Sequence, residues 1–373
     1  MRRMMSFRED LAALGKELHA KGRIDRRQLL AGLAALTALP AGFSTRAFAQ
    51  AQEIVLVNWG GDAVEYFGVA FGEPYTAATG VEVVIDGSGP SQGKIRNMVE
   101  SGAVTWDVCD SGGGSSIQLG STGYLREIDY AVVDRAKLFP GFDFKWGVTN
   151  YIYSFVLAYD TSEYSGDAAP KGWQDFFNLQ DFPGTRALRK DVLGHIEVAL
   201  MGAGVPMEEV YPITPAKEKL AWETVKSILD DTIFWSSGAE SQQFMRQQEV
   251  VMGCFWNTRT KAIYDETDGL WDWTWNQAIV LPGAWVVPKD NPAGDAVWPF
   301  IASMQDPAGQ VKLFELFGNA PANPAAAALV PPDLKRFNAT DPENYALQLP
   351  VDSEWYGANS ARVNKDYLDL IAT

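Results

Sequence analysis

The sequence predicts an α/β fold divided into two lobes. After residue 52, short apolar segments alternate with segments of helical periodicity, and this alternation is typical of parallel βαβ units. About 320 residues follow position 49, more than one ordinary hydrophobic core accommodates, so we expect two lobes. Residues 150–159 are almost continuously apolar or aromatic, as in a long buried strand that carries a chain between lobes.

The elements of the first lobe can be placed in order. The apolar residues 53–57 form the first expected strand. A helix is expected at 63–79 and should end at Gly80, because glycine readily adopts the left-handed conformation at a helix C-terminus. A strand, a helix and a strand are expected next, at 81–86, 91–100 and 106–110.

The elements of the second half follow the long strand. Residues 215–230 have the pattern of an amphipathic helix. The other expected elements are a helix from 173, a strand reaching 189, a strand at 248–257, a return strand at 284–288, a helix at 306–317 and a helix at the end of the chain.

The first 49 residues have the pattern of an export signal. Arg26 and Arg27 directly precede an apolar run over 29–39, which is too short to span a bilayer, and an Ala-Phe-Ala motif ends at Ala49. This order is typical of a twin-arginine signal peptide over residues 1–49. The alternative is an ordinary N-terminal helix with chance arginines. We therefore expect a periplasmic protein that crosses the inner membrane already folded.

The rest of the chain is strongly acidic. Residues 1–49 contain nine Lys or Arg and four Asp or Glu, which leaves 22 basic and 43 acidic residues and a net charge of −21. Such a charge repels phosphate backbones, so nucleic acid is not expected as a partner. No later apolar run is long enough to span a membrane, and we expect a soluble monomer.

Cysteine and histidine are scarce. Cys109 and Cys254 each lie in an apolar strand, so two buried thiols are favoured over one disulfide. His195 is the single histidine after residue 49. One histidine argues against a transition-metal site and against most Ser–His–Asp or Cys–His nucleophiles. We expect no catalytic residue, no metal and no cofactor.

A loop rich in glycine and serine, 111–116, follows the third expected strand. It lacks the terminal Gly-Lys-Ser/Thr of a P-loop, and no dinucleotide fingerprint is present. We interpret it as a strand-to-helix turn whose backbone N–H groups line a cleft and can accept the polar or anionic end of a ligand. Phosphate binding stays open.

Six short phrases occur in a characteristic order over nearly the whole chain after the export signal. They are Val-Asn-Trp at 57–59, Tyr-Thr-Ala-Ala-Thr-Gly-Val-Glu-Val at 75–83, Trp-Asp-Val at 106–108 running to Ser111, Trp-Gln-Asp-Phe at 173–176, Val-Met-Gly-Cys-Phe-Trp-Asn at 251–257 and Glu-Trp at 354–355. Together they resemble the periplasmic solute-binding proteins of ABC importers, in particular the spermidine/putrescine-binding branch.

The resemblance implies two α/β lobes joined by crossing strands, with a hinge and a ligand cleft between the lobes. Lobe one would be 53–155 plus 284–328, and lobe two 156–283 plus 329–373. It also implies an ABC transporter permease in the inner membrane as the partner, and a small amine as the ligand.

The same resemblance implies several site residues. The family cages an amine between aromatic rings and pairs its charge with carboxylates. The matching positions here are Trp59 and Trp256 as aromatics, Ser111 in the strand-to-helix turn and Asp191 as an acid of lobe two, and Asn257 lies beside Trp256 at the strand's carboxyl end. The tryptophans and Asp191 also have purely structural interpretations: a tryptophan at a strand end can pack under a loop, and Asp191 can cap the following helix.

The chain departs from the family pattern where amines are usually paired. Gly194 stands where the family has a second acid, and residues 281–283 stand where it has a Trp-x-Asp motif. Asn319 replaces a tyrosine and Tyr356 replaces a late glutamine; we include Tyr356 among the expected site residues. A polyamine would therefore leave ammonium charges unpaired in a closed cleft, which is costly. Arg259 could hold a carboxylate or phosphonate if it faces the cleft, although a solvent-facing position is slightly favoured.

We therefore expect a ligand with one cationic nitrogen, with or without an acidic end, such as an amino-acid derivative, a betaine, an opine or an aminophosphonate; a polyamine-like amine is the alternative. The expected function is the substrate-binding component of an ABC transporter. Two other classes stay open: a periplasmic enzyme exported by the twin-arginine route, and the ligand-binding partner of a sensor. An iron-binding relative would use clustered tyrosines, but Tyr151 and Tyr153 are favoured as core residues.

Overall fold

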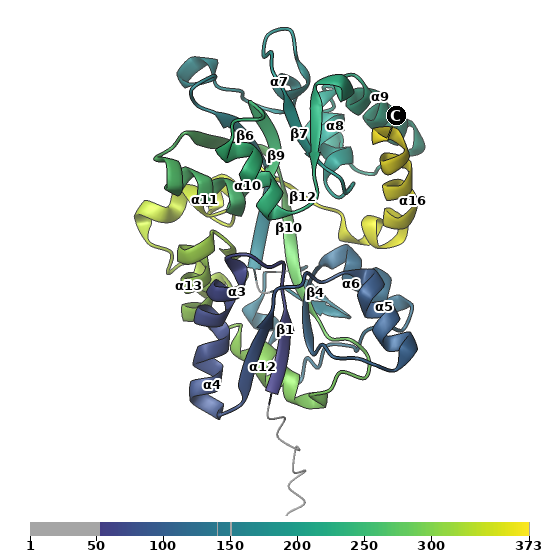
Figure 1. The fold of residues 1–373 in the computed structure, drawn as a ribbon, viewed down its shortest axis with the longest axis vertical. Coiled ribbons are helices and arrows are strands. Elements are labelled where there is room, and N and C mark those ends of the chain that lie inside the picture. Colours follow the sequence, from purple (N-terminus) through teal and green to yellow (C-terminus); the bar gives the residue numbers. More distant parts are fainter. Residues whose placement is uncertain (1–52, 140, 150, 373) are drawn as a thin grey trace, which may run out of the picture. The chain divides into compact units, whose positions relative to one another are not determined.

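One hydrogen-bonded path of strands runs through both lobes. The computed structural model describes residues 53–139, 141–149 and 151–372, and within them the main strands are ordered β2-β1-β3-β10-β6-β9-β7-β8 (Figure 1). The strands are β1 (Glu53–Val57), β2 (Glu82–Asp86), β3 (Val108–Gly112), β4 (Asp143–Phe144), β5 (Gly147–Val148), β6 (Tyr151–Asp160), β7 (Arg186–Arg189), β8 (Thr232–Trp235), β9 (Met252–Trp256), β10 (Trp271–Val286), β11 (Ala320–Pro321) and β12 (Leu349–Pro350).

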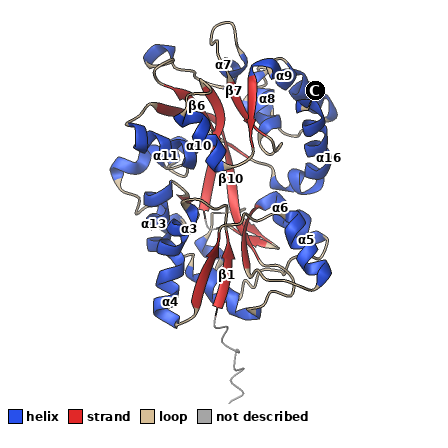
Figure 2. Cartoon of the chain, in the orientation of Figure 1, coloured by secondary structure: helices blue, strands red, loops and turns tan. Residues whose placement is uncertain are grey.

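Helices cover the strands of each lobe (Figure 2). A π-helical segment, Gly68–Gly72, joins α3 to α4 in one continuous run. The helices are α3 (Ala63–Phe67), α4 (Glu73–Thr79), α5 (Gln92–Ser101), α6 (Gly113–Ser121), α7 (Trp173–Phe177), α8 (His195–Gly202), α9 (Pro215–Lys226), α10 (Gly238–Arg246), α11 (Asn257–Thr267), α12 (Val297–Ser303), α13 (Pro307–Phe317), α14 (Pro324–Ala327), α15 (Pro342–Tyr345) and α16 (Ser353–Ile371).

Lobe one is built from the parallel βαβ units that the sequence predicts. Leu56 of β1 lies opposite Ile85 of β2 on one side and Val108 of β3 on the other. Gly80 ends α4 in the left-handed conformation, at φ 75°, and the side chain of Ser91 caps α5. Because the strands are parallel, their carboxyl ends lie together at one edge of the sheet.

Two long strands, β6 and β10, carry the chain between the lobes. β10 pairs antiparallel with β6 from Trp271 to Pro282, with an irregularity between Thr274 and Ile279, and its last four residues pair with β3 of lobe one. The buried cores divide within these same strands. In β6, Tyr151 packs with lobe one and Ile152 with lobe two; in β10, Leu281 packs with lobe two and Trp285 with lobe one. The strand predicted at 150–159 is present from Tyr151, and residue 150 lies outside the described residues.

Lobe two contains elements that the sequence patterns did not reveal. Its strand β7 lies between β8 and β9, parallel to both, and α8, α10 and α11 flank these strands. Strand β8, these three helices and α12 of lobe one were not predicted from the sequence. The prediction for α9 extended to residue 230, whereas this helix ends at Lys226, and only the end of the 16-residue strand β10 was predicted.

The C-terminal helix α16 packs closely against α6 of lobe one. A Cβ atom added at Gly114 would lie 3.1 Å from Cβ of Tyr356, and one added at Gly357 would lie 2.9 Å from Cγ2 of Ile117. The two glycines therefore allow an approach that larger residues would prevent. As a result, α16 contacts both lobes.

The predicted export signal at 1–49 lies outside the described residues. Among the described residues, the structure contains no helix with the length and apolar character needed to cross a membrane.

Candidate functional site

A cavity of about 320 Å³ lies between the lobes, where the carboxyl ends of β1, β3, β7 and β9 converge. This is the usual position of a ligand site in an open α/β sheet, because loops at these strand ends are free to carry functional side chains. The volume falls at the lower end of the range for small-molecule sites, roughly 300–1,000 Å³.

Lobe one contributes the turns that follow β1 and β3. Trp59 follows β1, and its side chain is 45% exposed at the cavity. Ser111 and Gly112 end β3, and Ser115 follows in the first turn of α6. Gln92 of α5 donates a hydrogen bond of 3.1 Å to Oγ of Ser115, so two helix N-termini of lobe one meet at the cavity.

Asp110 places a buried carboxyl group at the base of the cavity. It is 1% exposed and accepts a hydrogen bond from the hydroxyl of Tyr151. Desolvation raises the pKa of Asp110 to about 7, although contacts with Tyr151, Ser111 and Trp59 lower it in part. Among the described residues, no Lys or Arg nitrogen lies within 4.0 Å of this carboxyl group.

Lobe two contributes a charged and aromatic wall. Arg189 ends β7, and its guanidinium lies 5.0 Å from the ring centre of Trp256 and has a nitrogen 3.5 Å from Oδ1 of Asp191. Asp191 also accepts a hydrogen bond from the backbone nitrogen of Leu193 at 3.1 Å. All four side chains line the cavity.

Arg259 is a second cation in the cavity wall, in the first turn of α11. Its residue is only 4% exposed, its guanidinium lies 4.7 Å from the ring centre of Phe317, and one nitrogen donates to Gln242 at 3.4 Å. Burial lowers the pKa of Arg259 to about 10, so the group stays cationic at neutral pH. It forms no ion pair within 4.0 Å among the described residues.

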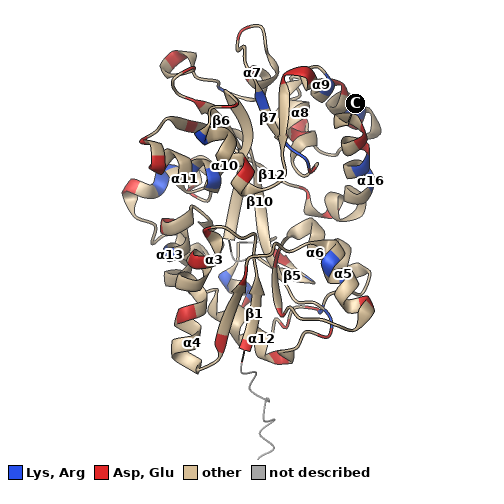
Figure 3. Cartoon of the chain, viewed as in Figure 1, with Lys and Arg blue, Asp and Glu red and all other residues tan. Residues whose placement is uncertain are grey.

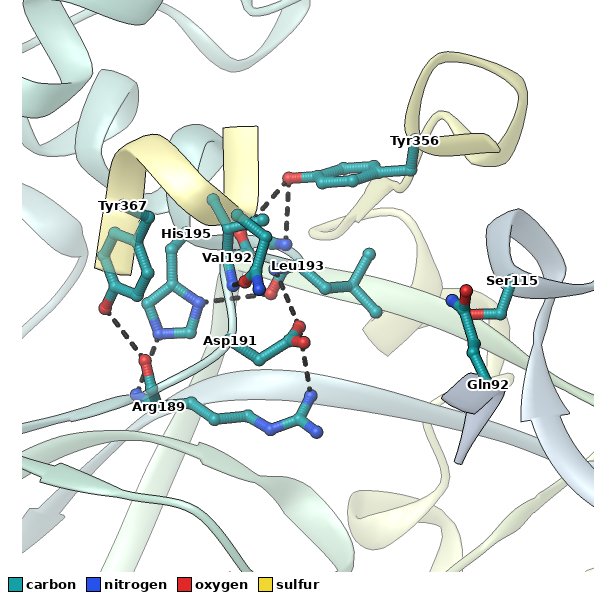
Figure 4. A network of polar contacts seen from close by, with 11 residues as sticks. Gln92, Ser115, Arg189, Asp191, Val192, Leu193, His195, Tyr356 and Tyr367 are labelled. Atoms are coloured by element: carbon teal, nitrogen blue, oxygen red, sulfur yellow. Dashed lines mark hydrogen bonds and ion pairs between the residues drawn. The ribbon is translucent and has the colours of Figure 1, made fainter. Parts of the chain in front are cut away.

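The segment that carries Arg189 and Asp191 is held from behind by His195 and α16 (Figure 4). The ring of His195 accepts a hydrogen bond from the backbone nitrogen of Arg189 at 3.1 Å, and the hydroxyl of Tyr367 donates to the Arg189 carbonyl at 2.8 Å. Desolvation lowers the pKa of His195 to about 4, so the ring stays neutral. These contacts fix the backbone of the segment.

Several buried polar atoms in the cavity wall have no hydrogen-bond partner among the described residues. They are Nε of Arg189, Nε1 of Trp256, Nε of Arg259 and Oδ1 of Asn319. Buried polar groups are normally paired. Three donors and one acceptor of the cavity wall are therefore unpaired among the described residues.

Five of the seven expected site residues line this cavity. They are Trp59, Ser111, Asp191, Trp256 and Arg259. The solvent-facing position that was slightly favoured for Arg259 is wrong, because its side chain is buried in the cavity wall. Asp191 lies four residues before α8 begins at His195, and it stabilises the turn between them.

Two expected residues have other contacts. The side chain of Asn257 lies in the core, where its Oδ1 accepts a hydrogen bond of 2.8 Å from the backbone nitrogen of Ser154. It does not line the cavity. Tyr356 is directed into lobe two, where its hydroxyl donates to Glu197 at 2.7 Å. Both were expected at the ligand site, and the structure places both outside the main cavity.

Other residues of the cavity wall were not predicted as ligand-binding from the sequence. Tyr151 and Tyr153 are favoured as core residues from the sequence; Tyr151 is buried in the core of lobe one and Tyr153 packs against it, and both residues also line the cavity from β6. Arg189 was not considered as a ligand-binding residue, and Asp110 was placed only as the end of a strand. The positions of Asp110 and Arg189 at the carboxyl ends of predicted strands could have identified both.

The positions that lack the family's acids have structural explanations. Gly194 has φ 81°, which a side chain would strain, and a Cβ atom there would lie 3.0 Å from the ring of Phe155. At Gly283, a Cβ atom would lie 2.4 Å from the ring of Tyr151. The tyrosine therefore occupies the space that a residue at 283 would need.

Among the described residues, no group of three or more His, Cys, Asp or Glu is arranged to hold a metal ion.

Cys109 and Cys254 are both buried, and neither forms a disulfide. Figure 3 shows acidic residues on elements of both lobes, including α3, α4, α9 and α10.

Comparison with known proteins agrees with this architecture. The gamma-aminobutyric acid-binding protein of Pseudomonas aeruginosa is 30% identical over 350 residues, which are 91% of this chain and 95% of the relative. The solved structure of the Atu4243-GABA receptor is 31% identical with a TM-score of 0.78, over 86% of this chain and 98% of that one. The PBP MotA from A. tumefaciens B6, in complex with glucopine, is 29% identical with a TM-score of 0.81, over 86% and 99% of the two chains.

These relatives are solute-binding receptors rather than enzymes. The family model for bacterial extracellular solute-binding proteins matches residues 70–343. The match covers well over half of the chain, and the expected α/β fold and family resemblance are confirmed. The chain belongs to the bacterial extracellular solute-binding proteins.

Proposed function

We propose that this protein is the periplasmic receptor of an ABC importer and that its ligand is a small zwitterion with one ammonium and one carboxylate group. One observation carries the proposal: the buried guanidinium of Arg259 and the buried carboxyl group of Asp110 line one cavity, and among the described residues neither lies within 4.0 Å of an oppositely charged side chain. The charge of Asp62 acts on Arg259 from farther away. Unpaired buried charges are costly, and a zwitterion would supply both missing partners.

The anionic end of the ligand would bind at the start of α11. The first N–H groups of a helix have no partner within the helix, and the helix dipole favours an anion there. Trp256 is the N-cap residue of α11 and Arg259 lies in its first turn, and Nε1 of Trp256 has no hydrogen-bond partner among the described residues. A planar guanidinium is suited to a carboxylate, since it can donate two parallel hydrogen bonds.

The ammonium end would bind between the two carboxyl groups. Burial raises the pKa of Tyr153, Arg189 lowers it in part, and the charges of Asp110 and Asp191 raise it further, so this hydroxyl lies within electrostatic range of both acids. The indole ring of Trp59 lines the same cavity and can face a cation. The names of two relatives, which refer to gamma-aminobutyric acid, support a ligand of this kind.

The proposed role in import rests on membership of the family and not on the geometry of the cavity. We assign ligand capture to the two lobes proposed at 53–155 plus 284–328 and at 156–283 plus 329–373, which would close about β6 and β10. Within β6, the core of lobe two extends back to Ile152. An inner-membrane permease would accept the closed form. Export would use the predicted twin-arginine signal at 1–49.

The proposal can be tested by calorimetry on the purified protein after its endogenous ligand has been removed. Gamma-aminobutyrate is compared with butylamine and butyrate, which each carry one of its two charges. We expect the zwitterion to bind at least about a hundredfold more tightly than either half, since each half leaves one buried charge unpaired. A panel of opines, betaines and aminophosphonates is measured in the same way.

Two arginine variants sharpen the test. Arg259→Gln should weaken binding of the zwitterion but not of butylamine. Arg246→Gln is the matched control, because Arg246 is exposed and pairs with Glu266 away from the cavity. Equal binding of butylamine and gamma-aminobutyrate would refute the carboxylate subsite. No binding by any zwitterion in the panel would refute the proposed ligand class.

A further inference from the structure

The guanidinium of Arg259 lies against helix α10, which packs beside α11 in lobe two (Figure 1). Gly238 and Gln242 of α10 are four residues apart, so they lie on the same face of this helix, and both face Arg259. Neither residue lines the ligand cavity, whereas Arg259 does. The two residues therefore lie behind the proposed carboxylate subsite.

Gly238 leaves free the space that the guanidinium occupies. A Cβ atom added at this position would lie 2.5 Å from Nε and 2.8 Å from Cζ of Arg259. Gly238 does not have a positive φ, so the backbone conformation does not require glycine here. The absence of a side chain at 238 thus serves the position of Arg259.

Gln242 gives Arg259 a hydrogen-bond acceptor that carries no charge. Oε1 of Gln242 accepts a hydrogen bond of 3.4 Å from Nη1 of Arg259, and Gln242 is 4% exposed. A guanidinium has five N–H donors and no acceptor, so a glutamate of nearly the same shape at 242 would make the same contact and would also neutralise the cation. The amide therefore orients Arg259 and leaves its positive charge uncompensated.

Other groups do not replace a carboxylate at 242. Arg259 forms no ion pair within 4.0 Å in the part of the chain that the structure describes. Asp62 acts on it from farther away, but Asp62 is exposed, so water and salt screen its charge. The ring of Phe317, 4.7 Å from the guanidinium, attracts a cation without neutralising it.

We propose that Gln242, with Gly238 beside it, determines the charge class of the ligand. Its neutral acceptor reserves Arg259 for the carboxylate of a zwitterion and disfavours a plain amine, which would leave the guanidinium unpaired. This inference rests on the proposed function, because it takes the carboxylate position from it. It adds that a positioning residue outside the cavity sets the preference, and that exchanging its amide for a carboxylate abolishes that preference.

The test measures the ratio of the affinities for gamma-aminobutyrate and butylamine by calorimetry. In Gln242→Glu, the new carboxylate pairs with Arg259 and repels the carboxylate of the ligand. Gamma-aminobutyrate should bind at least about tenfold more weakly than to the wild type, and butylamine at least as tightly, so the ratio should fall from about a hundred to below about ten. Nε2 of Gln242 has no hydrogen-bond partner among the described residues, so the substitution breaks no contact of this atom.

Two further substitutions in α10 separate charge from packing. Gln243→Glu is the matched control, because it introduces the same charge at the next position, which is exposed, and it should keep the wild-type ratio. Gln242→Met removes the acceptor without adding a charge. Both affinities should fall in this variant, but their ratio should stay within about threefold of the wild-type ratio, since Arg259 still lacks an anionic partner.

Gly238→Ala tests the position of Arg259 without a new charge. The guanidinium is the far end of a flexible side chain, so it should move away from the added methyl group while α10 stays in place. Gamma-aminobutyrate should bind at least about tenfold more weakly, and butylamine within about twofold of the wild type. Gly68→Ala is the control, because a Cβ atom there would meet no atom within 4 Å. Circular dichroism establishes that the variants are folded.

The outcomes separate the two proposals. If the wild type prefers gamma-aminobutyrate and Gln242→Glu keeps that preference, the inference fails alone. It also fails if Gln242→Met lowers the ratio as much as Gln242→Glu, because position 242 then acts through packing. If Gln242→Glu does not fold, an unchanged ratio in Gly238→Ala overturns the role of α10. If the wild type binds both compounds equally, the proposed function fails and the inference fails with it.

Discussion

The hydroxyl of Tyr356 donates a hydrogen bond of 2.7 Å to the buried carboxyl group of Glu197. Tyr211 donates a second hydrogen bond to the same group at 2.8 Å, and the backbone nitrogen of Gly194 donates to Tyr356 at 3.0 Å. Burial raises the pKa of Glu197, and the two hydroxyl groups lower it in part. The network thus joins α16 to the segment that carries Asp191.

Tyr356→Phe should therefore destabilise the protein. The variant keeps the ring but leaves Glu197 with one hydroxyl partner and Gly194 with none. We expect the free energy of unfolding to fall by about 1–3 kcal/mol, measured by urea denaturation. Tyr75→Phe is the matched control, because the ring of Tyr75 packs on Phe300 and its hydroxyl makes no side-chain hydrogen bond identified among the described residues. Equal stability of the two variants would contradict this role.

Ligand binding should depend on pH through Asp110. Its pKa is about 7 in the ligand-free protein because the carboxyl group is desolvated. An ammonium group bound nearby favours the ionised form and lowers this pKa. Binding near pH 7 should then release up to about half a proton, and affinity should rise as the pH increases through 7 and level off about one unit higher.

The proton release can be measured by calorimetry in buffers of different ionisation enthalpy. Asp110→Asn keeps an acceptor for Tyr151 but cannot titrate. This variant should bind more weakly and should lose the dependence on pH between about 6 and 8. A wild-type affinity that stays constant over this range would show that the ammonium group binds elsewhere.

The two thiols should be unreactive in the native protein. Cys109 and Cys254 are both fully buried, and burial raises the pKa of each. Because the thiolate is the reactive form, a thiol reagent should label neither residue in buffer and both in denaturant. Labelling of one thiol in the native protein would indicate local opening at β3 or β9. Labelling of neither in denaturant would indicate a disulfide.

The sequence revealed the fold better than it revealed the site. The βαβ units of lobe one were predictable because strand, glycine and helix signals alternate there at short intervals, as at Gly80. Helix α8 was missed because it is buried on nearly every side, so it lacks the amphipathic pattern that identifies a surface helix. Only the end of strand β10 was predicted, although tryptophans alternate with polar residues over 271–276, a pattern that is typical of a half-buried strand and could have identified its start.

The site depended on contacts that no local pattern contains. Tyr151 and Asp110 are 41 positions apart in the chain and meet only through the crossing strand β6. Arg259 was judged by its neighbours in the sequence, whereas its burial results from packing against Phe317 of α13. Tyr356 was placed by the family pattern, but its hydroxyl is directed to Glu197 by the orientation of α16.

At Asp191, a pair of substitutions can distinguish the role of the negative charge in ligand binding from the role of the side chain in the local turn. The side chain of Asp191 does two things: the oxygen Oδ1 accepts a hydrogen bond from Leu193, and the carboxylate lies 3.5 Å from Arg189. Asp191→Ala removes both, whereas Asp191→Asn retains an oxygen that can accept from Leu193 and removes only the charge. The pair of variants therefore distinguishes a residue that binds the ligand from one that shapes the turn.

We expect both variants to lose binding of the zwitterion, by at least about a hundredfold, because the ammonium group loses a carboxylate and faces an uncompensated Arg189. Thermal unfolding without ligand should be lowered more by alanine than by asparagine, by a few degrees at most, since only alanine removes the hydrogen bond at the turn. Calorimetry and thermal unfolding measure the two effects separately. If Asp191→Asn binds as tightly as the wild type, then the carboxylate does not hold the ammonium group, and Asp110 is the acid that must.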